Sequence, residues 1–136
     1  MSVNFLYEFH LKLHNLLSTE VKISKMVDKI YISVVQDAKY PFLLINMLSA
    51  NNISKFTDEI YEVEFEICIF SRDKNQGNLT LLADLIKAKL NLTNSHFIKY
   101  IIAGIRLGSV SFERSSDLIT TKLIMNYKAL IKQSVE

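Results

Sequence analysis

Two of the three histidines are spaced so that they could bind a metal together. His10 and His14 are four residues apart, and on a helix this spacing places both imidazoles on one face. However, the sequence has no glutamate between them and no obvious third ligand. We therefore expect two solvent-exposed histidines on the outer face of a helix, and no metal site.

Three glutamates are the second candidate for chemistry. Glu62, Glu64 and Glu66 alternate with apolar residues, so a strand would present all three on one face. Paired carboxylates can transfer protons or bind hard cations. The simpler interpretation, which we prefer, is a solvated sheet face or cross-strand pairing with Lys122 and Lys128.

The remaining reactive groups do not form a recognisable site. Cys68 lies within the same strand pattern, away from a helix N-terminus or an adjacent base, which favours a packed thiol over a nucleophile. A single cysteine cannot form an internal disulfide, and this usage fits a reducing cytoplasm. The three glycines do not have the spacing of a phosphate-binding loop. We expect no enzyme activity and no cofactor.

The length and composition are those of a globular protein. The 136 residues, 49% of them hydrophobic and 22% charged, fit a single domain over residues 1–136 with a core of its own. The N-terminus lacks a basic stretch followed by an apolar run, and no segment approaches the length of a bilayer. We expect neither secretion nor membrane insertion.

Charge is unevenly distributed, although the net charge is only +2. Acids predominate between residues 53 and 74, and bases predominate from residue 87 onward. In the C-terminal part the bases interleave with Tyr100, Phe112 and Tyr127, which could also suit a strand-based nucleic-acid platform. A small monomeric nucleic-acid-binding domain that uses this basic part is therefore our alternative for the function.

Hydrophobic periodicity predicts where the helices and strands lie. Phe5, Phe9 and Leu13 recur at four-residue steps, which is typical of an amphipathic helix. Strict alternation from Tyr61 to Ile69 predicts a strand. The expected elements are helices over 2–18 and 79–90, strands over 30–35, 42–48 and 61–69, and a hairpin of strands 97–112 and 118–132 around a turn at 115–117.

The resulting order, α-β-β-β-α-β-β, predicts an α+β fold. We expect a mostly antiparallel sheet of about five strands with two helices packed on one face. Gly104 and Gly108 would mark bends or a bulge in the C-terminal hairpin. Hairpin arms of about fifteen residues exceed the usual strand of five or six. Their ends and edges need cover, and a neighbouring copy of the chain is the simplest one.

A set of short motifs follows these elements in a fixed order from about Leu6 to Ile131. Its residues are Lys29-Ile30-Tyr31, Val34, Gln36, Asp37-Ala38, Tyr40 to Ile45, Phe65 to Arg72, Leu82, Ile86, Leu90, Gly104 to Leu107, Val110, Phe112-Glu113 and Tyr127 to Leu130. In order and spacing these motifs resemble the tail-completion family DUF3168, whose members occur in tailed phages, prophages and gene transfer agents. The sequence departs from the family's usual V-P-Q with Val34-Val35-Gln36.

The resemblance implies a tail terminator, a structural virion protein that is assembled in the bacterial host cytoplasm. Such a protein closes into a homo-oligomeric ring, expected to be a hexamer, on the head-proximal end of the tail tube. It stops polymerisation of the tail tube protein and joins the tail to the head–tail connector protein. DNA passes through its lumen without specific binding.

Two roles remain open for the charged residues under this hypothesis. An acidic strand and a basic hairpin could meet across subunits, because a ring needs contacts between unlike faces. Alternatively, the carboxylates could line the lumen and repel DNA phosphates. The candidate interface or lumen residues are Glu62, Glu64, Glu66, Arg106, Arg114, Lys122 and Lys128.

Overall fold

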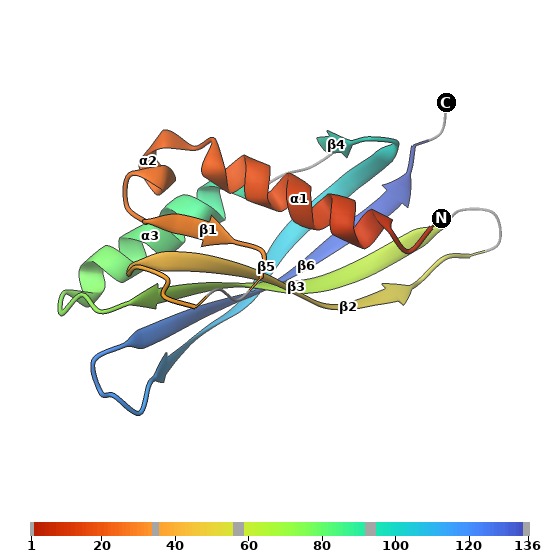
Figure 1. The fold of residues 1–136 in the computed structure, drawn as a ribbon. Coiled ribbons are helices and arrows are strands. Elements are labelled where there is room, and N and C mark those ends of the chain that lie inside the picture. The colour runs from red at the N-terminus through yellow and green to blue at the C-terminus, as the bar shows by residue number, and fades with distance from the viewer. Residues whose placement is uncertain (1, 34–35, 56–58, 92–94, 135–136) are drawn as a thin grey trace.

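A single mixed sheet organises the protein, and its helices lie on one face of that sheet (Figure 1). The computed structural model describes residues 2–33, 36–55, 59–91 and 95–134. The strand order in the six-stranded sheet is β1-β2-β3-β6-β5-β4. The elements are α1 (Phe5–Ser18), α2 (Val21–Ser24), β1 (Lys29–Tyr31), β2 (Phe42–Asn52), β3 (Ile60–Ser71), α3 (Gln76–Lys89), β4 (Ser95–Phe97), β5 (Tyr100–Arg114) and β6 (Thr121–Gln133).

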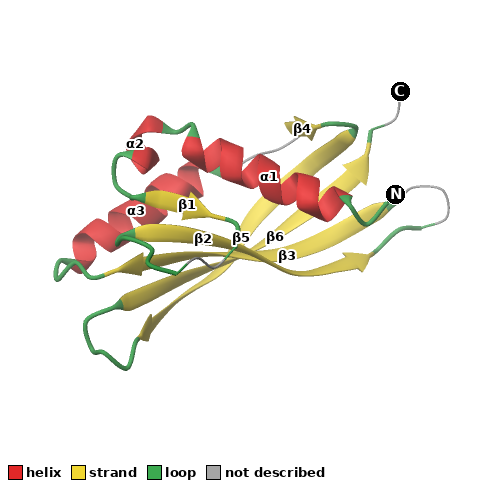
Figure 2. Ribbon diagram, viewed as in Figure 1, coloured by secondary structure: helices red, strands yellow, loops and turns green. Residues whose placement is uncertain are grey.

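The predicted α+β class and the placement of the main helices on one face are confirmed (Figure 2). The prediction of about five strands was too low by one, because β4 was missed. The short helix α2 was also missed. Neither segment is long enough to show a hydrophobic period. Among the described strands, the pair of β1 with the start of β2 is the only parallel one.

Helix α1 forms because its apolar residues follow the helical period. Phe5, Phe9, Leu13 and Leu17 are all buried against the sheet. Phe9 meets Phe65 of β3 edge to face, with ring centroids 5.5 Å apart. Helix α3 packs on the same face of the sheet as α1.

Helix α3 begins at a side-chain cap. The Asn75 side chain accepts a hydrogen bond from the backbone N–H of Gly77 at 2.9 Å. Leu79, Leu82 and Ile86 then face the core. The helix therefore starts directly after its cap, at Gln76, ahead of the first residue of its apolar pattern, Leu79.

Strands β3 and β6 form the centre of the sheet. Their pairing runs without a break from Ile60 opposite Lys132 to Ser71 opposite Thr121. Odd-numbered residues of both strands face the helices, and the Phe65 and Tyr127 rings stack there with centroids 5.2 Å apart. The even-numbered residues form the opposite, helix-free face.

The long C-terminal hairpin is confirmed, with irregularities near the two glycines. The β5–β6 pairing extends from Tyr100 to Arg114 on one arm. Its register shifts between Ile102 and Gly104 and again between Leu107 and Ser109. Gly108 is the extra residue at the second shift, as expected for a bulge.

Several strand boundaries differ from the prediction. The hairpin strands β5 and β6 begin at Tyr100 and Thr121, each three residues after the predicted start. β1 ends at Tyr31, whereas the strand was expected to continue to Val35; Val34 and Val35 lie outside the described residues. β2 continues to Asn52, beyond the expected end at Leu48. Its last residues are polar, so the apolar run that marked the strand ended before the backbone pairing did.

The outer strands cover only part of each sheet edge. β1 pairs with β2 at residues 42–44, and β4 pairs with β5 at residues 100–102. Among the described residues, the rest of β2 and β5 has no strand on its outer side. The sheet therefore ends in two long open edges.

Removing the Phe9 ring tests the packing of α1. We expect Phe9→Ala to lower the free energy of unfolding by about 3–5 kcal/mol, because the ring is fully buried between Phe65 and Phe97. Tyr7→Ala, on the exposed side of the same helix, is the control and should change it by about 0.5 kcal/mol or less. Urea denaturation measures both values. Equal effects of the two substitutions would contradict the assigned face of α1.

Candidate assembly surfaces

The helix-free face brings together most of the charged residues predicted from the sequence. Glu64 lies opposite Lys128, which in turn lies opposite Arg106, so these three form one row across the sheet. The Lys128 ammonium is 3.6 Å from a Glu64 carboxylate oxygen and 3.9 Å from one of Glu62. The predicted cross-strand pairing with Lys128 is confirmed.

Lys122 has a different partner from the predicted one. Its ammonium lies 4.0 Å from Glu113, directly across the β5–β6 pair, and 5.6 Å from the centre of the Phe70 ring. The prediction that Lys122 pairs with the glutamates of β3 was therefore wrong. The residue directly opposite Lys122 on β3 is Phe70.

Glu66, the third glutamate of β3, accepts a hydrogen bond from an amide side chain. The side-chain nitrogen of Asn46 donates to Glu66 at 3.2 Å. In the same row, the Asn126 side chain donates to the Ser109 hydroxyl at 3.2 Å. This part of the face is polar but carries only one charge.

The two arginines of the candidate set lie on opposite faces. Arg106 shares the helix-free face with Lys128 and has no ion pair within the described part of the chain. Arg114 lies opposite Thr121, and Thr121 lies opposite Ser71, an odd-numbered residue of β3. Arg114 therefore belongs to the other face, so the structure does not bring it to the other six candidates.

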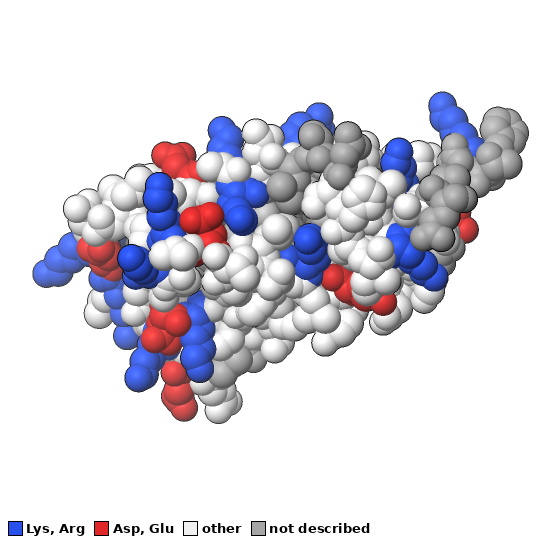
Figure 3. Space-filling model, turned by 90° about the horizontal axis from the view of Figure 1, so that it is seen from above, with Lys and Arg blue, Asp and Glu red and all other residues white. Residues whose placement is uncertain are grey.

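The helix-free face carries charges of both signs. The carboxylates of Glu62, Glu64, Glu66 and Glu113 lie on the same face as the cations of Arg106, Lys122 and Lys128. Acidic and basic side chains are also intermixed on the side of α1 (Figure 3). The acidic middle and basic C-terminal third of the sequence thus neutralise each other where β3 meets β6.

A small apolar cluster is buried at one end of the helix-free face. Leu44, Cys68 and Ile124 form it, and Tyr31 and Phe70 partly cover it. Burial raises the pKa of the Cys68 thiol to about 12, and the nearby Glu66 carboxylate adds to the shift. The predicted packed, unreactive thiol agrees with this environment.

The paired histidines contact the sheet edge, so the prediction that they are solvent-exposed was wrong. His10 Nε2 lies 2.6 Å from the carbonyl oxygen of Ile45, and His14 Nε2 lies 2.8 Å from that of Ile30. Each imidazole donates to a strand carbonyl, because a carbonyl can only accept. Helix α1 runs along the β1–β2 edge, so its flank faces backbone groups rather than water.

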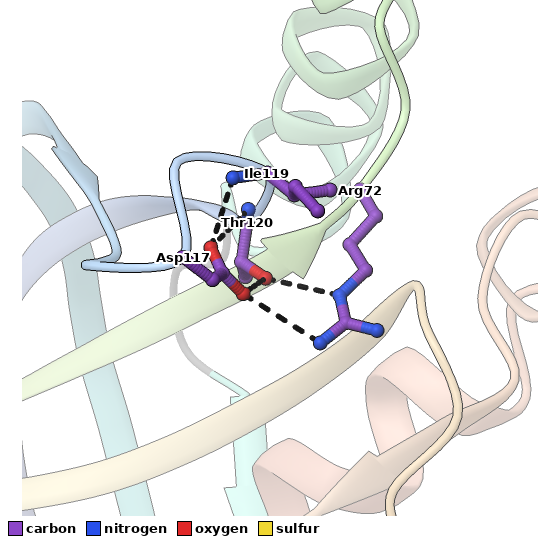
Figure 4. Close-up of polar contacts among 4 residues, drawn as sticks. All are labelled: Arg72, Asp117, Ile119 and Thr120. Atoms are coloured by element: carbon purple, nitrogen blue, oxygen red, sulfur yellow. Dashed lines mark hydrogen bonds and ion pairs between the residues drawn. The ribbon is translucent and has the colours of Figure 1, made fainter.

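The turn of the C-terminal hairpin is fastened to the rest of the sheet by Arg72 (Figure 4). Its guanidinium donates to the Thr120 hydroxyl at 3.0 Å and lies 3.6 Å from the Asp117 carboxylate. The same group lies 4.1 Å from the centre of the Tyr40 ring. Arg72 thereby links the start of β2, the end of β3 and the hairpin turn.

The Asp117 carboxylate organises the turn itself. It accepts backbone N–H groups of Thr120 and Ile119, each at 2.9 Å, and the Thr120 hydroxyl at 2.8 Å. These hydrogen bonds, and to a smaller extent Arg72, lower the pKa of Asp117.

Two exposed apolar surfaces were not predicted from the sequence. One lies on the outer side of α1, where Val3, Tyr7 and Leu11 follow the four-residue helical step. The other lies at the far end of the hairpin, where the helices do not reach, and comprises Val110, Phe112, Leu118 and Ile119. The alternation of the hairpin arms suggested two ordinary faces and did not reveal which stretch the helices leave bare.

A hollow of about 470 Å³ lies between α3 and the middle of β5. Its apolar lining includes Ile105, Leu107 and Tyr127, and the charged residues Asp84 and Lys87 of α3 also line it. The Tyr127 hydroxyl is buried and has no hydrogen-bond partner among the described residues. Burial raises the pKa of this phenol.

Two features are absent from the described residues. These residues contain no cluster of three or more His, Cys, Asp or Glu side chains arranged to hold a metal ion. None of their helices has the length and apolar character needed to cross a membrane.

Comparison with known proteins reveals a shared fold. No protein-family model and no curated protein sequence matches the chain. A chain of the virion of a native gene transfer agent particle superimposes with a TM-score of 0.80 at 10% identity, covering 96% of this chain and 99% of that one. The bacteriophage SPP1 gp17 protein gives a TM-score of 0.57 at 14% identity, covering 96% and 93%. At such identities the likeness is one of fold.

The hydrogen bonds to Asp117 make stability depend on pH. A carboxyl whose pKa is lowered by folding stabilises the protein fully above its ordinary pKa of about 3.9, and the contribution is lost as the pH falls through the lower folded value. We expect Asp117→Asn to be less stable than the wild type at pH 7, and the difference to shrink below about pH 4. Urea denaturation across this range measures it. A difference that does not change with pH would show that the negative charge is not what stabilises the turn.

Proposed function

We propose that this chain is a tail terminator, a non-enzymatic structural protein of a phage or gene transfer agent particle. The observation that carries the proposal is the fold shared over nearly the whole length with a chain of the gene transfer agent virion. The family resemblance of the sequence points the same way. The protein closes into a ring, a hexamer under this proposal, at the head-proximal end of the tail tube.

Ring formation is supported by the two exposed apolar surfaces. A cyclic ring needs two unlike surfaces on each subunit, one for each neighbour. The outer side of α1 and the far end of the hairpin lie on different elements, and the apolar side chains of both are exposed. Contiguous apolar surface of this kind favours burial against another protein.

The helix-free face is suited to line the lumen. Two of its cations are held by neighbouring carboxylates, Lys128 by Glu62 and Glu64 and Lys122 by Glu113, whereas Arg106 has no ion pair within the described residues. Such a face offers few free cations to DNA phosphates, whose attraction to unpaired Lys and Arg dominates nonspecific binding. DNA therefore passes without being retained.

The ends of the ring contact different partners. One rim contacts the last ring of tail tube protein and stops its polymerisation, and the other contacts the head–tail connector protein. The hairpin turn, held by Arg72 and Asp117, is a firm element for such a contact. The protein is located in the virion after assembly in the bacterial cytoplasm.

The alternative function, a monomeric nucleic-acid-binding domain, receives less support. Lys122 and Lys128, two of its candidate cations, are paired with acids of the same face. Arg114 lies on the other face from them. The basic part of the sequence thus does not form one continuous basic surface.

Native mass spectrometry of the purified protein, alone and with the tail tube protein from the same genome, tests the ring. We expect a closed oligomer of ring size, at least in the presence of tube protein, and tube assemblies of limited length. Tube protein without this chain is the control for length. A strict monomer in both conditions would overturn the proposal.

Reversing charges on the helix-free face tests the lumen. We expect the wild type to bind duplex DNA weakly at about 0.15 M salt and Glu64→Lys/Glu66→Lys to bind more tightly, with a steep salt dependence. Asp28→Lys/Asp84→Lys makes the same change in net charge outside this face and should bind less tightly than the first variant. Fluorescence anisotropy at several salt concentrations measures all three. Tight, salt-dependent binding by the wild type would favour the nucleic-acid-binding alternative.

A further inference from the structure

The open edges of the sheet differ in what they expose. On the outer side of β2, residues 46–52 have no strand partner within the described part of the chain. On the outer side of β5, residues 104–114 are likewise open. Open edges present unpaired backbone N–H and C=O groups, which readily pair with another chain.

The β2 edge lacks the usual protection. Soluble proteins protect edge strands with charges, prolines or cover. From Phe42 to Ile53 the sequence has no charged residue and no proline, and Leu48 is 50% exposed. The His10 imidazole satisfies the Ile45 carbonyl, but the strand continues beyond it.

The backbone N–H groups near the end of β2 point either toward β3 or outward, and one hydrogen bond shows which do which. The N–H of Ile53 donates to Ile60 of β3 at 2.9 Å. Because successive residues alternate in direction, the N–H groups of Ala50 and Asn52 point outward. These donors are available to a neighbouring strand.

The β5 edge has apolar surface beside it. Val110 and Phe112 are 45% and 52% exposed, although both lie on the helix side of the sheet. The hollow between α3 and β5 adjoins the same strand and contains the unpartnered Tyr127 hydroxyl. A protein that packs along this edge covers apolar side chains and can supply an acceptor for that hydroxyl.

We propose that the β2 edge of one copy pairs with the β5 edge of the next, so that the sheet continues around the ring. This inference rests on the proposed ring and names its interface. β2 and β5 lie on opposite sides of the sheet and run in opposite directions, as the three intervening antiparallel pairings require. A copy related by rotation therefore presents β5 antiparallel to β2, and the contact is heterologous, as ring closure demands.

The positions of the open stretches fix the stagger between copies. Within one copy Ser49 is level with Arg106, through Glu64 and Lys128. Pairing residues 46–52 with residues 108–114 places Ser49 opposite Ser111 instead of Arg106. On β6 these two positions are level with Ile124 and Lys128, so the shift is four paired positions. The free end of β2 and the hairpin turn lie at opposite ends of the sheet, as this shift requires (Figure 1).

The size of this stagger agrees with a closed barrel. Four positions correspond to about 14 Å along the strands, at about 3.4 Å per residue. The four long strands of a copy span about 19 Å across, at about 4.8 Å per strand. The ratio gives a strand tilt of about 35°, at the lower end of the range of about 35–45° that closed barrels adopt. The helix-free face then forms a continuous inner wall.

Engineered cysteines test the contact directly. Ser49 and Ser111 are exposed, and within one copy β3 and β6 separate them. We expect mild oxidation of Ser49→Cys/Ser111→Cys to give a ladder of disulfide-linked oligomers up to ring size. Each single variant should stop at dimers, and the wild type should give none, because Cys68 is buried.

Edge variants provide an independent measurement. Ala50→Pro removes an outward N–H, and Val110→Lys places a charge on the opposite edge. We expect both to shift the oligomer to monomer in native mass spectrometry while the circular dichroism spectrum stays that of a folded protein. Leu81→Lys, an equally exposed apolar position on α3, should still form rings.

The outcomes separate this inference from the proposed function. A wild type that never forms rings overturns both. Rings that form while the double cysteine variant gives no ladder, or while both edge variants still assemble, overturn only the pairing of β2 with β5. A ladder together with monomeric edge variants supports it.

Discussion

The register between β3 and β6 is the constraint on which the rest of the structure depends. The pairing places Phe65 beside Tyr127 under the helices and Glu64 beside Lys128 on the other side. A slip of one residue would exchange the two faces of a strand, moving carboxylates into the core and phenyl rings into water. Both the buried core and the charge-neutralised face therefore follow from a single alignment of two central strands.

The sequence was most informative where a period was long and regular. The alternation around Glu64 predicted β3 and its two faces, and the four-residue step around Phe9 predicted α1. Short elements such as α2 and β4 contain too few residues for a period, so they were missed. The end of β2 was misplaced because backbone pairing continued after the side chains became polar.

The candidate surface was predicted only in part, because position in the sheet depends on contacts between distant segments. Lys128 met its predicted partners, whereas Lys122 paired with Glu113 on its own hairpin. His10 followed the helical period correctly but faced an open strand edge, which no local pattern reveals. For the same reason the bare apolar end of the hairpin was not foreseen: only the finished packing shows how far the helices extend.

The buried environment of Cys68 has a consequence for the behaviour of the protein in oxidising surroundings. Thiolates, not thiols, react with oxidants and disulfides, and this thiol stays protonated at any physiological pH. It is also inaccessible beneath Phe70 and Tyr31. The single thiol of the chain is therefore in the same protonated, inaccessible state in reducing and in oxidising surroundings.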